Sequence, residues 1–177
     1  MNVRRRTRLT ASADGFTLVE AVLCVLLVAV AAATAMTVVR ESAKIQFRTS
    51  ELSTARLLAD GLMADITSLA YQDPVYITVN PGTESGETSS SKTNYDDVDD
   101  YNGWNESPPK DRDGNTLSGY TGWKRTATVE WVSPTAPAGT ASSSETGLKR
   151  ITVNVYHNNV LVLTRVALRA NVPLMNG

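Results

Sequence analysis

Cysteine and histidine are almost absent from this sequence, which contains only Cys24 and His157 among its 177 residues. A single cysteine excludes an intramolecular disulfide in any compartment. Zinc sites draw their ligands from several cysteines and histidines, and histidine-based nucleophilic catalysis would depend on this one residue. No nucleophile, base and orienting group can be combined with a consistent spacing. We therefore expect that the protein is not an enzyme.

Net charge is also small, at −1 with a pI near 5.8, and it gives no indication of a nucleic-acid partner. The charges are unevenly distributed, however. The first fifteen residues hold four arginines and one aspartate, a balance of +3, whereas the remainder holds 13 basic and 17 acidic residues, a balance of −4. A basic N-terminus before an apolar run is typical of a membrane protein whose N-terminus stays in the cytoplasm.

Charged residues are absent from residues 21–39. As a helix this run would extend roughly 28 Å, close to the thickness of the hydrocarbon core of a bilayer. One interpretation is a simple signal anchor. A second is a secretory signal peptide with Ala33-Thr34-Ala35 as its cleavage site. However, the run exceeds the usual h-region of about 7 to 15 residues, and Glu20 lies at its start, where a translocating signal gains nothing from a carboxylate.

A third interpretation gives that carboxylate a role. The segment Gly15-Phe16-Thr17-Leu18-Val19-Glu20 lies between the basic leader and the apolar run. It resembles the processing site of the type IV prepilin superfamily, which includes type IV pilins and type II secretion pseudopilins. The resemblance implies cleavage between Gly15 and Phe16 by a prepilin peptidase, N-methylation of Phe16, and an assembly role for Glu20. It also implies a single pass of the inner membrane, with a cytoplasmic N-terminus and a periplasmic head, and later assembly with other pilins or pseudopilins.

The physical chemistry of Glu20 is consistent with this role. A carboxylate at the start of an apolar helix is costly in lipid, and ionisable residues in membranes are candidates for function. Cleavage after Gly15 would create a cationic α-amino group on Phe16, with which Glu20 of a neighbouring subunit could pair. Such a pair would compensate both charges and help to fix the axial register between helices. The alternative is that Glu20 only reaches the lipid headgroups from the end of its helix.

Beyond residue 40, apolar residues recur at spacings of three and four, which predicts an amphipathic helix packed against the rest of the protein. This apolar stripe comprises Leu52, Ala55, Ala59, Leu62, Ile66 and Leu69. We expect one helix from Phe16 to about Tyr71, roughly 80 Å long. Its end is predicted there because Asp73 precedes Pro74, and the residue before a proline avoids the α region.

The remaining residues predict a small sheet with two loops rich in polar and small residues. Strands are expected at 75–79, 126–132, 149–156 and 160–170, and loops at 80–94 and 133–147. The last two strands form a hairpin around His157, which we expect to be a solvated turn residue. One apolar face is predicted for Ile151, Val153 and Val155, and another for Val160, Val162, Val166 and Leu168.

We therefore predict an α+β fold, in which a long N-terminal helix packs on a small antiparallel sheet. The expected segments are a leader (1–15), a transmembrane or filament-core helix (16–39), an amphipathic helix (40–72) and a head (73–177). The chain departs from many pilins at Thr37, the twenty-second mature residue, where a helix-kinking proline is common. It also lacks their two-cysteine loop near the C-terminus. Both departures favour a pseudopilin or minor pilin over a major pilin.

Four aspartates in five positions, Asp96, Asp97, Asp99 and Asp100, form the most unusual soluble stretch. One interpretation is a Ca²⁺ site at these four residues, since hard cations take carboxylate and carbonyl oxygens, although the spacing does not fit an EF-hand. The other is an acidic turn with backbone hydrogen bonds, against which Tyr95, Tyr101 and Trp104 pack. The stretch is also similar to one in minor prepilin-like proteins of the mannose-sensitive haemagglutinin pilus type, which implies a minor subunit for initiation, tip or assembly.

These features together predict a minor pilin or pseudopilin of a type IV pilus or type II secretion system. The alternative is a membrane-anchored or secreted binding protein with no filament role, whose acidic and aromatic region contacts a ligand. The first residue of the mature chain separates the interpretations. A methylated Phe16 indicates a prepilin, Met36 a secretory signal peptide, and an uncut Met1 a signal anchor.

Overall fold

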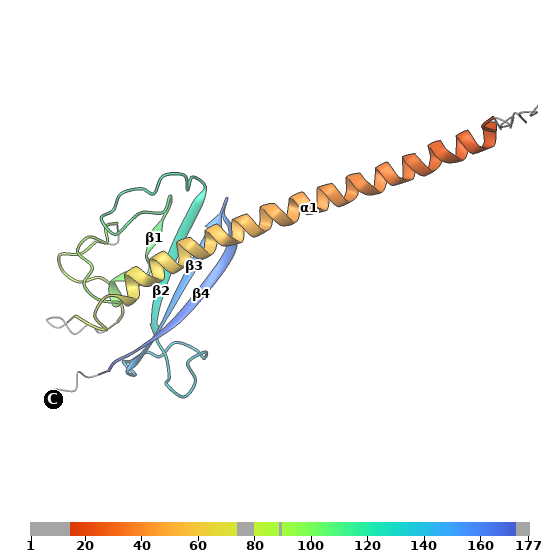
Figure 1. Cartoon of the computed structure of the whole chain (residues 1–177). Helices are drawn as coiled ribbons and strands as arrows, with labels where there is room; N and C mark the ends of the chain where they lie inside the picture. The colour runs from red at the N-terminus through yellow and green to blue at the C-terminus, as the bar shows by residue number, and fades with distance from the viewer. Residues whose placement is uncertain (1–14, 74–79, 89, 173–177) are drawn as a thin grey trace, which may run out of the picture. The chain divides into compact units, whose positions relative to one another are not determined.

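The computed structural model describes residues 15–73, 80–88 and 90–172. The chain divides into two compact units, Met1–Phe47 and Arg48–Gly177. The helix α1 (Leu18–Thr67) runs through the boundary between them (Figure 1). A four-stranded antiparallel sheet in the second unit completes the secondary structure that the described residues form, apart from one short 3₁₀ helix, so the α+β prediction is confirmed.

The first part of α1 is an uninterrupted apolar helix. Its residues 21–39 are mostly alanine, valine and leucine, with neither glycine nor proline to break it. Thr34 and Thr37 in this segment form hydrogen bonds within the helix. Their hydroxyls donate to the carbonyls of Ala31 (2.9 Å) and Thr34 (2.7 Å), respectively. The backbone and these hydroxyls therefore need no hydrogen bond from outside this segment.

The end of α1 differs from the prediction. The helix ends at Thr67, four residues before the expected Tyr71. The reason is a tertiary contact, because Ala70 forms a parallel bridge with Asp97. The amide of Ala70 donates to the carbonyl of Asp96 (3.3 Å), and its carbonyl accepts from the amide of Val98 (3.1 Å). The chain therefore leaves the helix where backbone partners from the acidic stretch are present, before the proline takes effect.

The sheet has the order β1-β2-β3-β4, and neighbouring strands are antiparallel. The strands are β1 (Asn105–Glu106), β2 (Trp123–Trp131), β3 (Leu148–His157) and β4 (Val160–Ala170). The predicted strand 160–170 has the observed bounds, 149–156 is one residue short at each end, and 126–132 begins three residues late and ends one residue late. Strand β1 was not predicted, and the expected strand at 75–79 lies outside the described residues.

The β3–β4 hairpin closes on Asn158 and Asn159, whose φ angles of 49° and 65° are those of a type I′ turn. The pairing register then skips Val162, since Val155 pairs with Leu163 and Tyr156 with Leu161. A bulge of this kind moves the side chains that follow to the other face of the sheet. Val160 therefore does not share a face with Val166, which corrects the single face predicted for β4.

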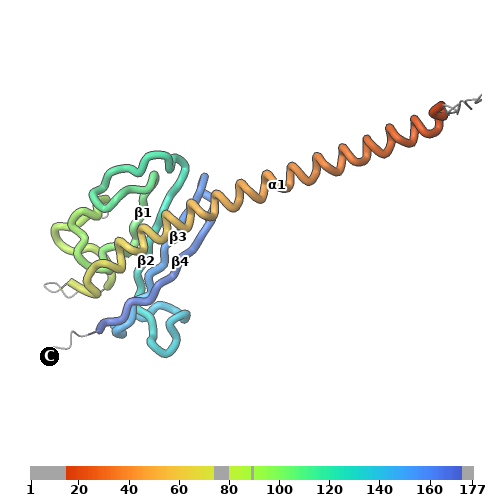
Figure 2. Tube along the Cα trace, viewed as in Figure 1, coloured from red at the N-terminus to blue at the C-terminus, as the bar shows by residue number. Residues whose placement is uncertain are grey.

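The core lies between the C-terminal part of α1 and one face of the sheet, as Figures 1 and 2 show for the second unit. The helix contributes Ala55, Leu58, Ala59, Leu62 and Ile66, and the strands contribute Ala127, Val129, Ile151, Val153 and Val155. Burial of Ala55, Ala59, Leu62, Ile66 and Leu69 confirms the predicted stripe, but Leu69 lies beyond the end of the helix and Leu52 is half-buried. The buried Leu58 was missed. Burying each of the larger side chains stabilises the fold by about 1.5 to 3 kcal/mol.

Arg125 and Lys149, two of the buried cations, connect the helix and the loops to the sheet. Arg125 on β2 pairs with Glu106 on β1 and donates to the carbonyl of Leu58 on α1 at 3.0 Å. Lys149 on β3 pairs with Asp99 at 2.8 Å and donates to the carbonyl of Tyr71. Because buried charges are tolerated only with partners, these contacts fix the acidic stretch against the sheet.

Candidate functional site

The predicted cleavage site lies immediately before α1. Gly15, Phe16 and Thr17 are exposed and not helical, and the helix begins at Leu18. No atom outside the adjacent residues lies within 4 Å of the position that a Cβ on Gly15 would occupy. The peptide bond between Gly15 and Phe16 is thus in open, non-helical backbone. The basic residues of the leader lie outside the described residues.

Glu20 forms a reciprocal contact with Thr17 at the first turn of the helix. The backbone amide and the hydroxyl of Thr17 donate to Glu20 Oε2, at 3.2 and 3.0 Å. In return, the amide of Glu20 donates to the hydroxyl of Thr17 at 3.3 Å. This arrangement is a capping box, which satisfies amides that have no partner within the helix. Sequence analysis did not identify it, although the Thr-x-x-Glu spacing is its signature.

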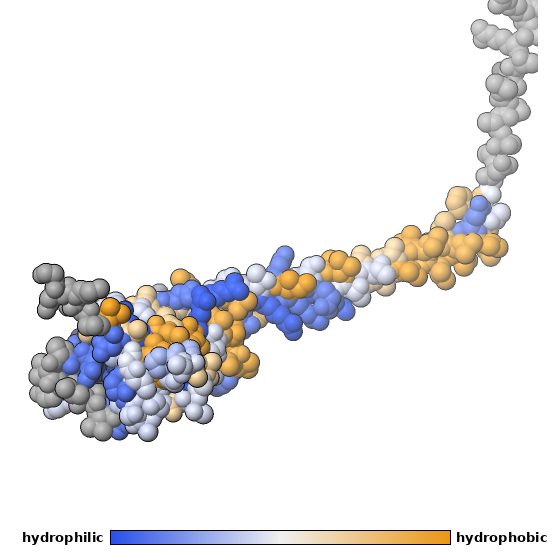
Figure 3. Space-filling view, turned by 90° about the horizontal axis from the view of Figure 1, so that it is seen from below, coloured by the Kyte–Doolittle hydropathy of each residue, from blue (hydrophilic) through white to orange (hydrophobic). Residues whose placement is uncertain are grey.

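The surface of α1 next to this cap is apolar. Figure 3 shows apolar side chains along the N-terminal part of the helix on the visible face. The exposed large hydrophobic residues of this part include Leu18, Val19, Val22, Leu23, Val25, Leu26, Leu27, Val28 and Val30. Among the described residues, α1 is the one helix long and apolar enough to cross a membrane, and a signal sequence meets the same criteria. A contiguous exposed apolar surface of this length is typical of a segment that contacts a membrane or another protein.

The acidic stretch is folded inward, with three of its aspartates buried and Asp96 exposed. Asp97 accepts hydrogen bonds from the amides of Asp99 (2.6 Å) and Asp73. Asp100 Oδ2 accepts from the amides of Asp96 (3.0 Å) and Asp97 (3.1 Å). These contacts form the acidic turn with backbone hydrogen bonds that the sequence allowed as its second interpretation.

Three aromatic rings pack around this turn, as expected. Tyr95, Tyr101 and Trp104 are all buried, and each pair makes an edge-to-face contact with ring centroids 5.0 to 6.2 Å apart. The short 3₁₀ helix η1 (Asp99–Tyr101) places Tyr101 in the core and directs Asp99 toward Lys149. The turn is therefore part of the core rather than a mobile surface loop.

The four aspartates do not gather into one ligand group in the part of the chain that the structure describes. Asp97 and Asp99 are engaged by backbone amides and by Lys149, whereas Asp100 faces two acids of another loop. One carboxylate oxygen from each of Glu84, Glu87 and Asp100 lies within 4.8 Å of the others. Of the four residues at which a Ca²⁺ site was predicted, Asp96, Asp97, Asp99 and Asp100, only Asp100 belongs to this cluster.

Burial and mutual repulsion change the acidity of this region. Burial, followed by the interaction with the Glu87 carboxyl, raises the pKa of Asp100 to about 9. The same two causes raise the pKa of Glu84 to about 7. Burial and the charge of Asp99 raise the pKa of Asp97 to about 6. Burial and the nearby acids together oppose the ionised forms, although the hydrogen bond with Asp100 acts in the opposite direction on the pKa of Glu84, so the cluster favours protons or another cation.

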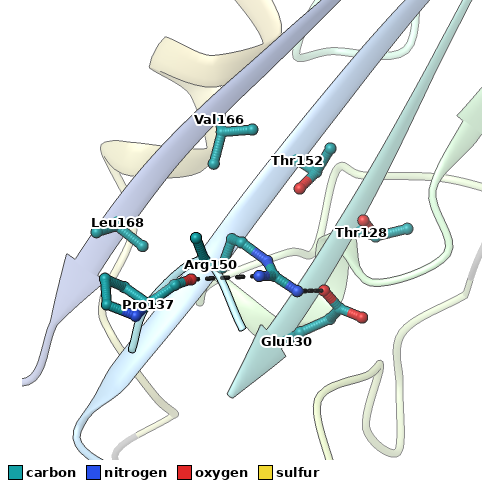
Figure 4. A pocket seen from close by; sticks show the side chains of 8 residues that line it. Thr128, Glu130, Pro137, Arg150, Thr152, Val166 and Leu168 are labelled. Carbon is teal, nitrogen blue, oxygen red and sulfur yellow. Dashed lines mark hydrogen bonds and ion pairs between the residues drawn. The ribbon is translucent and has the colours of Figure 1, made fainter. Parts of the chain in front are cut away.

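An open groove of about 580 Å³ lies on the opposite face of the sheet from α1 (Figure 4). Its floor is formed by β2, β3 and β4, and the loop 133–147 forms one side. Arg150 donates to Glu130 (2.8 Å) and to the carbonyls of Pro137 (3.2 Å) and Gly139 (2.8 Å). Its charge is therefore neutralised, and its donors connect the loop to the sheet.

His157 is not the solvated turn residue that we predicted. It is the last residue of β3, and its ring stacks on Trp123 with centroids 4.4 Å apart. Its Nδ1 lies 2.6 Å from Oε1 of Glu51 on α1. The histidine thus connects the helix to the end of β3, and the turn itself consists of Asn158 and Asn159.

No family model matches the chain, and no curated protein or solved structure matches it significantly. The architecture itself is pilin-like, since a long apolar N-terminal helix packs its C-terminal part on a four-stranded antiparallel sheet. This likeness concerns the arrangement of helix and sheet. The function must therefore be argued from the residues described above.

Proposed function

We propose that this protein is a minor pilin or pseudopilin that a prepilin peptidase cleaves between Gly15 and Phe16 and that assembles into a periplasmic or surface filament. The observation that carries the proposal is the contrast between the two parts of α1. Residues 21–39 carry no charge and are exposed, whereas Ala55, Leu62 and Ile66 are buried against the sheet. A single helix thus joins a surface that requires an apolar environment to a folded polar head.

The apolar surface fits two successive environments. In the inner membrane, lipid covers residues 18–39, and the head lies in the periplasm. In a filament, the same surface packs against the helices of other subunits. Transfer between the two is favourable only if packing between helices replaces the contacts with lipid, because lipid and apolar side chains are equally non-polar.

Glu20 is the side chain that distinguishes these environments. It is the first charged residue of the described chain, and the next is Arg40, so no charged residue intervenes within the apolar part of α1. Cleavage before Phe16 would produce an α-amino group four residues from Glu20. Pairing with such an amino group on a neighbouring subunit would stabilise the assembled state more than the membrane state, since the charges are less hydrated there.

The identity of the mature N-terminus tests the proposal. The full chain is produced in cells that contain a prepilin peptidase and its assembly machinery, and the purified protein is analysed by intact mass and N-terminal peptide mapping. A chain that begins with methylated Phe16 is expected. A chain that begins at Met36, or that retains Met1 in the presence of active peptidase, would contradict the proposal and favour an exported or membrane-anchored binding protein.

Recovery of the protein with sheared filaments provides the second measurement. We expect a small, reproducible amount in the filament fraction together with the major subunit. A matched control is Gly15→Val, which places a branched side chain at the cleavage position while α1 is left unchanged. That variant should remain uncut in the membrane and be lost from the filament fraction. Equal recovery of the uncut variant in filaments would contradict the role of processing.

A further inference from the structure

A loop and a turn of the head bring three carboxylates together. Glu84 and Glu87 belong to the segment 80–88, and Asp100 belongs to η1. One oxygen from each lies within 4.8 Å of the other two. Like charges at this separation repel strongly in a site with little water, so the arrangement needs a compensating positive charge. None of the ion pairs among the described residues includes Glu84, Glu87 or Asp100.

The buried oxygens of this cluster supply a second observation. Asp100 is 1 % exposed, and its Oδ1 accepts no hydrogen bond from the described residues. Both carboxylate oxygens of Glu84 are also buried and without a hydrogen-bond donor in that part of the chain. Buried polar atoms almost always have a partner, and each exception requires an explanation. These three oxygens all belong to members of one acidic cluster, and a bound cation would supply the partner that they lack.

The surrounding hydrogen bonds hold the two segments in place. Asn94, Tyr95 and Asn102 donate to the carbonyls of Gly86 (3.2 Å), Thr88 (3.1 Å) and Pro81 (2.9 Å), respectively. Asn102 also accepts from the amide of Val129 on β2 at 3.1 Å, which connects the assembly to the sheet.

The two acids of the loop are also oriented locally. The amide of Glu84 donates to Oε2 of Glu87 at 3.0 Å, and the amide of Glu87 donates to the carbonyl of Glu84 at 3.2 Å. Asp100 is held by its Oδ2, which accepts from two backbone amides and leaves Oδ1 for a ligand. The carboxylates of Glu87 and Asp100 are therefore positioned before any cation binds.

We propose that Glu84, Glu87 and Asp100 form a Ca²⁺ site that fastens the loop 80–88 to the acidic turn. The ligands are all carboxylate oxygens, two from a loop and one from η1, which suits an ion that accepts six to eight oxygens with variable geometry. Mg²⁺ fits less well, because it requires near-octahedral ligands and gives up its water reluctantly. The proposal concerns the head, and its test requires no filament assembly, so it is independent of the proposed function.

Thermal unfolding of the full chain tests this site. The protein is purified in detergent micelles, stripped with a chelator, and followed by tryptophan fluorescence at neutral pH. Free Ca²⁺ of roughly 0.1 to 10 mM is expected to raise Tm by about 5 to 10 °C, since a ligand that binds only the folded state stabilises it by mass action. Mg²⁺ at equal concentration should give a smaller rise. An equal or larger rise with Mg²⁺ would contradict the assignment to Ca²⁺.

The double variant Glu84→Gln/Glu87→Gln should lose the response to Ca²⁺. Its Tm in chelator should equal or exceed that of the native chain, because the substitutions remove repulsion while the side chains keep their shape. Asp96→Asn is the matched control, since it changes an exposed acid of the same stretch, and it should keep the full response. An unchanged response in the double variant would overturn the proposal.

Calorimetric titration of the unsubstituted chain tests Ca²⁺ binding even if a variant does not fold. One Ca²⁺ per chain is expected, with proton release at neutral pH as the cation displaces protons from the raised carboxyl groups. No binding heat and no change in Tm at about 10 mM Ca²⁺ would show that protons alone compensate the cluster, and the proposal would be wrong.

Discussion

Thr17 and Glu20 hydrogen-bond to each other in both directions at the first turn of α1. Glu20 thus has a local role as the capping partner of Thr17 in addition to its proposed pairing with a neighbouring subunit. The two roles make different chemical demands. A cap requires an acceptor oxygen, which glutamine also provides, whereas the pair requires a negative charge.

Glu20→Gln is therefore expected to retain the cap and the cleavage after Gly15 but to reduce incorporation into filaments by about tenfold or more, the loss that corresponds to a charge-assisted contact. Thr17→Val removes the capping hydroxyl at a cost of about 1 kcal/mol to the helix end and keeps the charge. Its incorporation should stay near that of the unchanged chain. Filament fractions and N-terminal mass analysis measure both effects. Normal incorporation of Glu20→Gln would show that the charge is not needed.

Arg125→Met is expected to destabilise the head by about 3 to 5 kcal/mol, because it leaves the buried Glu106 without its arginine partner and removes the arginine donors to the carbonyls of Leu58 and Lys110. Arg165→Met is the control, since Arg165 forms an exposed ion pair with Asp60 at 2.9 Å. It should cost less than about 1 kcal/mol. Urea unfolding of the detergent-solubilised chain gives both values. Similar losses of unfolding free energy for the two variants would show that the buried contacts of Arg125 contribute no more to stability than an exposed ion pair.

Leu62→Ala should cost about 2 to 5 kcal/mol, because Leu62 is fully buried and the substitution leaves a cavity between α1 and the sheet. Leu57→Ala changes the same side chain on the same helix, where Leu57 is largely exposed. It should change the free energy of unfolding by less than about 0.5 kcal/mol. The urea midpoints of the two variants check this contrast. Equal midpoints would contradict the packing of α1 described above.

The pH dependence of stability follows from the raised pKa values of Asp97, Asp100 and Glu84. These acids bind protons more tightly in the folded state than in the unfolded state, so their contribution is fully present below about pH 4 and is lost as pH rises to about 9. In chelator, Tm should therefore rise as the pH is lowered from 8 to 5.

Groups near the cluster modify this dependence. Glu87 and Asp99 repel the ionised forms, whereas Lys149 favours ionised Asp97. Saturating Ca²⁺ should flatten the profile, because the cation replaces the protons. Thermal scans across this range, with and without Ca²⁺, provide the measurement. A Tm that increases from pH 5 to pH 8 in chelator would contradict the raised pKa values.

Local patterns in the sequence predicted the elements that depend on neighbouring residues. The strand 160–170 and the buried faces of Ala55, Leu62 and Ile66 follow from spacing alone, since periodicity places side chains on one face. The end of α1 at Thr67 did not follow, because the contact of Ala70 with Asp97 decides it. The same limit applies to the two-residue strand β1, which exists through its pairing with β2.

The cluster of Glu84, Glu87 and Asp100 shows most clearly what local sequence patterns cannot predict. The four aspartates are recognisable in the sequence as a run of like charges. Glu84 and Glu87, in contrast, lie 16 and 13 residues before Asp100 in a loop of low complexity. No spacing rule connects such positions. A Glu-x-x-Glu pair close to the aspartates was the available signal, and it is too common to be specific. Which of the acids meet depends on how the loop folds back onto η1.

The sequence by itself determined the apolar run, the lone Glu20 before it, the amphipathic stripe and the final hairpin, because each depends on residue type and local period. The tertiary structure decided which carboxylates are neutralised by Lys149 and backbone amides and which face one another. Electrostatic interactions depend on distance and burial rather than on order along the chain. For that reason, Asp97, Asp99 and Asp100 differ in their surroundings although they lie within four positions of the sequence, and only Asp100 joins the proposed cation site.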